Sequence, residues 1–134
     1  MHQELIIEPT ARVSDRLYFF DSGNERIMWV DYSKSSPEAM ISLLEKASDF
    51  GKESGEKLNI LANFKSTPQS AKFNKKLKEH GKLYYKSGIK VKVAVLGIDS
   101  SLKRVVVNAT MVITRIKNVK LFESKQDAIK WLTV

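Results

Sequence analysis

Residues 93–98 form an unbroken apolar run, Val-Ala-Val-Leu-Gly-Ile, with the length of a β-strand. Its valines and isoleucine are β-branched and favour extended structure. Because no polar residue alternates with the apolar ones, both faces of the strand must be covered, as in the interior of a parallel or mixed α/β sheet. The sequence therefore predicts an interior strand over residues 90–98, and Gly97 with the polar residues after it predicts a turn into a helix.

Further strands are predicted on both sides of this one along the chain. Five segments have apolar, β-branched or aromatic composition: residues 5–8, 17–20, 27–32, 58–64 and 119–122. The first of them ends at Pro9, which suits an edge strand or an extended arm. Residues 21–24 read Asp-Ser-Gly-Asn and have the composition of a tight turn, so the second and third segments are predicted to pair as an antiparallel hairpin.

Four segments repeat apolar residues at the spacing of a helix: 37–50, 69–86, 102–116 and 124–132. Ser36 and Ser124 are in place to act as N-caps of two of these helices. The third segment is rich in residues that favour strands, but its spacing of three and four predicts a helix. The resulting order, β-β-β-α-β-α-β-α-β-α, predicts a single α/β domain over residues 1–134. We expect a mixed, mostly parallel sheet with an N-terminal antiparallel hairpin and helices on both faces.

The composition excludes several kinds of chemistry. The chain has no cysteine, which excludes disulfides, thiolate catalysis and cysteine-ligated metal ions. His2 and His80 are far apart and lack the spacing of metal ligands, so we expect no metal site and no cofactor. No residues suggest an acid–base pair or an activated nucleophile, so we do not expect an enzyme. Without a run of about eighteen apolar residues no transmembrane segment is predicted, and a cytoplasmic location is the default.

The positive charge is concentrated in one part of the chain. Residues 65–92 contain nine lysines and one acid, Glu79, so this segment has a net charge of +8, the same as the whole chain. Four of the lysines fall on the predicted outer face of helix 69–86: Lys72, Lys75, Lys82 and Lys86. Such a basic patch suits nucleic acid, an anionic membrane surface or an acidic protein. A solvated helix face is the simpler interpretation.

The order of elements and four local strings resemble the STAS domain superfamily. The strings are Val-Ala-Val-Leu-Gly-Ile at 93–98, Leu-Lys-Arg-Val-Val-Val-Asn-Ala at 102–109, Lys-Leu-Phe-Glu-Ser at 120–124 and Asp-Ala-Ile-Lys-Trp-Leu at 127–132. The closest likeness is to the SpoIIAA-like branch, which is related in shape to the lipid-binding CRAL-TRIO (SEC14-like) domain. Because the superfamily includes anti-sigma-factor antagonists, the resemblance implies a non-enzymatic regulatory domain that binds a protein partner.

The resemblance also suggests where a partner would bind. In the antagonist branch, a serine that follows an aspartate at the start of a helix, after the second central strand, is phosphorylated to break partner binding. Residues 63–70 correspond to that region and read Asn-Phe-Lys-Ser-Thr-Pro-Gln-Ser, without an Asp-Ser pair. We expect the loops at residues 65–70 and 97–101, with the helices that they open, to form the contact surface. The expected contact residues are Lys65, Ser66, Thr67, Ser70, Gly97, Asp99 and Ser100.

The sequence is also compatible with functions other than protein binding. Asp99 or Ser100 at the end of an interior strand also suits an ordinary helix cap. Phe19, Phe20 and Tyr32 lie in predicted strands and suit either the core or an apolar pocket, which would make the domain a carrier of a small hydrophobic molecule or a lipid. Besides protein binding and the carrier function, a third interpretation is nucleic acid binding through the basic patch. A homodimer is compatible with each of these functions.

Overall fold

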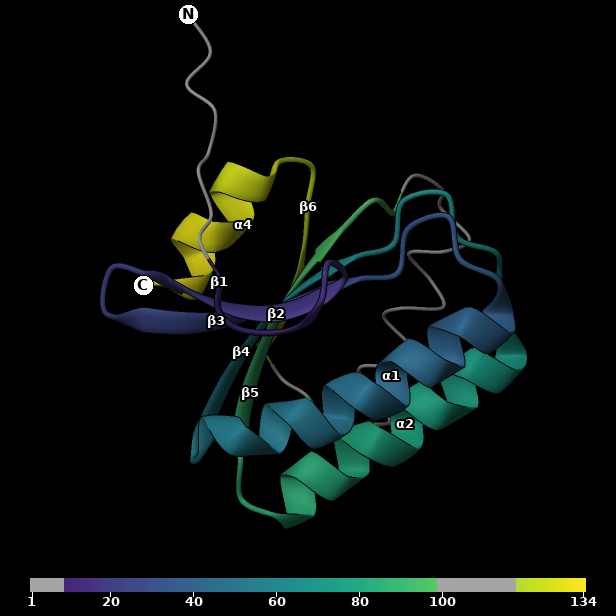
Figure 1. Cartoon of the computed structure of the whole chain (residues 1–134), viewed down its shortest axis with the longest axis horizontal. Coiled ribbons are helices and arrows are strands. Elements are labelled where there is room, and N and C mark those ends of the chain that lie inside the picture. Colours follow the sequence, from purple (N-terminus) through teal and green to yellow (C-terminus); the bar gives the residue numbers. More distant parts are fainter. Residues whose placement is uncertain (1–8, 99–117) are drawn as a thin grey trace, which may run out of the picture.

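The computed structural model describes residues 9–98 and 118–134 (Figure 1). The predicted strand 5–8, the predicted helix 102–116 and the candidate residues Asp99 and Ser100 lie outside the described residues.

The described chain forms one six-stranded sheet in the order β1-β2-β3-β4-β5-β6. The strands are β1 (Pro9–Ser14), β2 (Leu17–Ser22), β3 (Glu25–Asp31), β4 (Lys57–Asn63), β5 (Lys90–Leu96) and β6 (Asn118–Phe122). Strands β1 to β3 pair antiparallel, and β3 to β6 pair parallel. The prediction of a mixed, mostly parallel sheet with an antiparallel hairpin is therefore confirmed.

Helices cover both faces of the sheet (Figure 1). The helices α1 (Pro37–Gly51) and α2 (Ala71–Lys86) lie side by side on one face, and α4 (Lys125–Leu132) lies on the other. A 3₁₀ turn, η1 (Lys52–Ser54), follows α1. Helices α1 and α2 share a face because each connects parallel strands that advance in the same direction across the sheet, and right-handed crossovers then fall on the same side.

The helix starts agree with the local sequence. Ser36 caps α1, and its side-chain oxygen accepts a hydrogen bond from the Ala39 amide at 3.2 Å, with Pro37 at the first helical position. Ser124 caps α4 in the same way, accepting from the Asp127 amide at 3.1 Å. Both caps were predicted from the sequence and are confirmed.

Strand β5 is an interior strand, as predicted, but it is not the middle of the sheet. It pairs with β4 on one side and β6 on the other, and β6 forms the edge. Its two faces pack against different helices: Ala94 and Leu96 join the cluster around α4, and Val91 joins the cluster around α1 and α2. A strand with apolar neighbours on both faces needs no alternation of polar residues, which explains the unbroken run in the sequence.

Strand β1 is an element that the sequence did not predict. It runs along the edge of the sheet, and all of its residues after Pro9 are exposed. Pairing of Ser14 with Leu17 leaves Asp15 and Arg16 as a two-residue turn. Because this strand is held by backbone hydrogen bonds to β2 and buries little of its own surface, it has no apolar pattern to reveal it. The opening proline suits the start of an edge strand.

Two polar contacts join α1 to α2 at the level of Ser48. His80 Nδ1 and Ser48 Oγ share a hydrogen bond of 2.8 Å, and the Tyr84 hydroxyl donates to the Ser48 carbonyl oxygen at 2.8 Å. Tyr84 is buried, and its burial raises the pKa of its hydroxyl. His80 is thus a partly buried, hydrogen-bonded residue of the helix pair. The helix pair is thus fixed by specific contacts as well as by apolar packing.

We expect Tyr84→Phe to lower the free energy of unfolding by about 1 kcal/mol, because a buried hydrogen bond between the helices is lost while the ring stays in place. Urea denaturation measures the change. Tyr18→Phe is the control, since Tyr18 is only partly buried and its ring packs near Trp29. An equal loss in both variants would show that the Ser48 contact contributes nothing specific.

Candidate interaction surface at the carboxyl edge of the sheet

Three parallel strands, β3, β4 and β5, end at the same edge of the sheet, and the segments that follow them contact one another. The Tyr32 amide donates to the Asn63 carbonyl at 2.9 Å, and the Phe64 amide donates to the Leu96 carbonyl at 2.8 Å. We call residues 32–36, 64–70 and 97 the carboxyl-edge surface. Loops after parallel strands commonly form binding sites in α/β sheets, because they converge at one edge.

Gly97 brings the end of β5 against the loop after β4. A Cβ atom at this position would lie 2.4 Å from the Lys65 nitrogen and 2.7 Å from the Lys65 Cα. The φ angle of Gly97 is +83°, in the region that favours glycine. The two loops that the sequence assigned to one contact surface, around Lys65 and around Gly97, are therefore in direct backbone contact.

Two non-glycine residues of this surface have left-handed backbones. Lys34, after β3, has a φ of 56°, and Ser66, after β4, has a φ of 57°. Both side chains are exposed, and the Lys34 amide donates to the Lys65 carbonyl at 3.1 Å. Residues other than glycine, asparagine and aspartate are uncommon in this conformation, which costs about 1–2 kcal/mol, and such residues gather at functional sites. The pair marks the loops as conformationally fixed.

A polar network at the strand ends holds the loops in this geometry. The Asp31 carboxylate accepts from the Ser33 amide at 3.0 Å and from Asn63 Nδ2 at 3.2 Å. Asn63 Oδ1 in turn accepts from the Lys65 amide at 3.2 Å. Arg16, in the β1–β2 turn, adds a clamp by donating to the carbonyl oxygens of Asp31 and Ser33 at 3.0 and 2.7 Å. Asp31, Asn63 and Arg16 thus position the surface, and the sequence analysis did not identify them.

The three predicted hydroxyl groups of this region have different roles. Thr67 is buried and donates to the Phe64 carbonyl at 2.8 Å. Ser70 caps α2 by accepting from the Phe73 amide at 3.1 Å. Ser66 is exposed. Thr67 and Ser70 therefore shape the loop, whereas Lys65, Ser66 and Gln69 are exposed and present polar or charged groups to a partner.

An aromatic cluster packs between the carboxyl-edge surface and the core. Tyr32 stacks on Phe64 with ring centroids 4.8 Å apart, and Phe73 meets Tyr32 edge-on at 5.3 Å. Tyr32 and Phe73 are buried, and burial raises the pKa of the Tyr32 hydroxyl. The cluster joins the loops after β3 and β4 to the first turn of α2, so the surface rests on the core and not on a flexible support.

A cavity of about 150 Å³ lies between the sheet and the helices α1 and α2. Its described lining is mostly apolar and includes Met28, Val30, Tyr32, Ala62, Phe73 and Val95. Of the aromatic residues expected to line a pocket, Tyr32 lies on it, whereas Phe20 packs on the α4 side of the sheet and Phe19 packs against Phe50. Phe19 and Phe20 therefore belong to the core, the other interpretation left open for them by the sequence.

The basic patch is exposed, as the sequence predicted. Lys72, Lys75, Lys82 and Lys86 project from the side of α2 opposite the buried residues Phe73, Gly81 and Tyr84. Lys92, from the same basic segment, lies elsewhere: its ammonium group donates to the Trp131 carbonyl of α4 at 2.6 Å. The structure therefore divides the basic segment between α2, the carboxyl-edge surface and the contact of β5 with α4.

The described residues hold no cluster of three or more His, Asp or Glu side chains that would suit a metal ion. In the same part of the chain, no helix is both long and apolar enough to span a membrane. No family model, curated protein or solved structure matches the chain.

Proposed function

We propose that this protein is a non-enzymatic regulatory domain of STAS-like type that binds a protein partner through the carboxyl-edge surface. The observation that carries the proposal is the pair of exposed, left-handed residues Lys34 and Ser66, on loops joined by the Lys34–Lys65 hydrogen bond. A surface that is fixed before binding loses little conformational entropy when a partner docks, which favours affinity. The exposed ammonium groups of Lys34 and Lys65 suit a partner with acidic residues at its contact face.

Site-specific photo-crosslinking tests this proposal. A photoreactive amino acid is placed at Lys34 or Ser66, and control proteins carry it at Asn24 or Glu56, which are exposed at the opposite edge of the sheet. We expect the same protein to be captured from positions 34 and 66 and not from the controls, and the purified partner to bind the unmodified domain. Capture from the control positions alone, or equal capture from all four, would contradict the proposal.

Two substitutions at Ser66 test whether this residue is held in the left-handed conformation. Ser66→Gly relieves the left-handed backbone while increasing the entropy of the unfolded chain, so we expect stability to change by less than about 1 kcal/mol. Ser66→Val places a β-branched side chain at a φ of 57°, and we expect a loss of about 1–2 kcal/mol. Thermal and urea denaturation measure both. Equal stability of the two variants would show that Ser66 is not held in this conformation.

A second function, carriage of a small apolar molecule, is favoured by the cavity between the sheet and α1/α2. Two of the polar groups at its wall already have partners: His80 contacts Ser48, and Thr67 contacts the Phe64 carbonyl. Most of the lining that a ligand would meet is apolar. Its volume of about 150 Å³ matches a ring-sized molecule and is below the roughly 300–1,000 Å³ of ordinary ligand pockets, which disfavours a whole lipid.

Benzene is a suitable probe for this second function. We expect benzene to raise the melting temperature of the wild-type protein and to have no effect on Ala62→Leu, because Ala62 is buried and lines the cavity. Native mass spectrometry of protein purified without refolding should also detect an apolar compound bound to it. Absence of both the thermal shift and a co-purified compound would eliminate the carrier function.

A further inference from the structure

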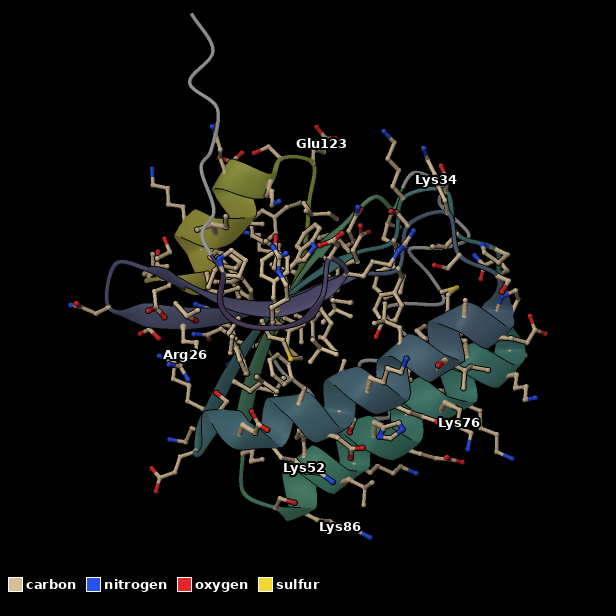
Figure 2. All side chains as sticks on the ribbon, viewed as in Figure 1. Arg26, Lys34, Lys52, Lys76, Lys86 and Glu123 are labelled. Atoms are coloured by element: carbon tan, nitrogen blue, oxygen red, sulfur yellow. The ribbon has the colours of Figure 1, made fainter. Side chains whose placement is uncertain are left out.

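The outward face of α2 carries a row of lysines that the carboxyl-edge surface does not use. Lys72, Lys75, Lys82 and Lys86 are separated by three, seven and four residues, so they fall on one side of the helix. The row extends over roughly 21 Å, at about 1.5 Å per residue. Figure 2 shows Lys76 and Lys86 of this helix pointing away from the sheet. We propose that this face binds the surface of a bilayer containing anionic phospholipids, a function beyond the protein binding proposed above.

The lysines of the row lack partners within the described part of the protein. Some other cations of the described residues are paired, as in Arg26 with Asp21 at 3.8 Å and Lys57 with Glu25 at 2.8 Å. Glu79, the one acid of α2, falls within the row between Lys75 and Lys82, and its carboxylate lies 3.8 Å from the ammonium group of Lys76. Among the described residues, no ion pair involves the four lysines of the row. Their mutual repulsion falls when an anionic surface approaches.

The neighbouring helix limits the basic surface to α2. The exposed residues of α1 include Glu38, Glu45 and Asp49, against Lys46. The net positive charge on this side of the protein therefore lies on α2. The helix face that carries it has a fixed orientation relative to the sheet. Docking through α2 would leave α4, on the opposite face, pointing away from the membrane.

The composition of this face favours a bilayer over nucleic acid. Residues 65–92 contain no arginine, the residue best suited to bidentate contacts with phosphate. Leu83, half of whose surface (50%) is exposed, lies next to the row and can enter the headgroup region. Lysine side chains combine apolar stems with a charged tip, and so suit an interface of lipid and water. A single helix face also offers no groove that follows a nucleic acid backbone.

Co-sedimentation with lipid vesicles tests the proposal. The protein is mixed with vesicles of phosphatidylcholine alone or of phosphatidylcholine with one quarter phosphatidylglycerol. We expect binding only to the anionic vesicles, weakening as salt is added. Replacing Lys75, Lys82 and Lys86 by Gln should reduce the partition coefficient about 100-fold, at roughly five-fold per lysine. Leu83→Ser should reduce the binding that remains at high salt.

A matched variant replaces Lys46, Lys120 and Lys130 by Gln, which removes the same charge from exposed positions outside α2. We expect it to retain vesicle binding within about three-fold, and both triple variants to keep the wild-type melting temperature. Equal losses in the two variants would overturn the proposal, because net charge alone would then explain binding. So would a lack of binding to anionic vesicles, or tighter binding to an RNA oligonucleotide at equal phosphate concentration.

Discussion

Gly97→Ala lowers the free energy of unfolding by about 3 kcal/mol and separates the loops of the carboxyl-edge surface. Two costs combine in this expected result. The φ of +83° is unfavourable for any residue with a Cβ atom, at about 1–2 kcal/mol. The new methyl group would also lie 2.4 Å from the Lys65 nitrogen, which is backbone and cannot rotate away, so one of the two loops must move.

Gly23→Ala is the matched control for this substitution. Gly23 also has a positive φ, +60°, but a Cβ atom there would meet nothing within 4 Å. We therefore expect only the conformational cost, about 1 kcal/mol, and no effect on partner binding. Urea denaturation of the three proteins separates the two contributions. If Gly97→Ala were no more destabilising than Gly23→Ala, the contact of Gly97 with Lys65 would not exist in solution.

Phe73→Ala has the second large expected effect, a loss of about 3–5 kcal/mol. Phe73 is 3% exposed and packs edge-on against both Tyr32 and Phe64. Truncation leaves a void under the two loops and removes two aromatic contacts. Because these rings support the carboxyl-edge surface, we also expect weaker binding to a protein partner under conditions where the variant is still folded.

Phe73→Leu is the comparison, since it keeps most of the apolar volume and we expect it to cost about 1–1.5 kcal/mol. Stability is measured by urea denaturation, and affinity by titration with the partner captured by crosslinking. A loss below about 1 kcal/mol in Phe73→Ala would contradict the packing described for the aromatic cluster.

Elements with strong local patterns were predictable from the sequence. The apolar run at 93–98 predicted an interior strand because both of its faces contact apolar side chains. Ser36 with Pro37, and Ser124, predicted helix starts because caps act within one turn of backbone. Strand β1 was missed for the opposite reason: its pairing with β2 depends on backbone groups and leaves no apolar pattern.

The candidate site was predictable only in outline. Loops that follow parallel strands meet at one edge, so residues 65–70 and Gly97 could be placed together before the structure. The left-handed backbones of Lys34 and Ser66 carry no local signal, since neither is glycine or asparagine. They are imposed by contacts between distant segments, such as the Lys34–Lys65 hydrogen bond, which only the fold reveals.

The position of β5 shows a similar limit. Its composition indicated coverage on both faces, but the order of strands across the sheet depends on crossovers that the sequence does not encode locally. For the same reason the aromatic residues Phe19 and Phe20 could not be assigned to a pocket or to a core. They are neighbours in one strand and point to opposite faces of the sheet.

An amide NMR titration of the isotope-labelled protein with the captured partner tests the central claim most directly. The carboxyl-edge account predicts shift changes concentrated at residues 32–36, 64–70 and 97, with little change on α4. Changes centred on α4 or on the outward face of α2, with the three loop segments unaffected, would contradict it.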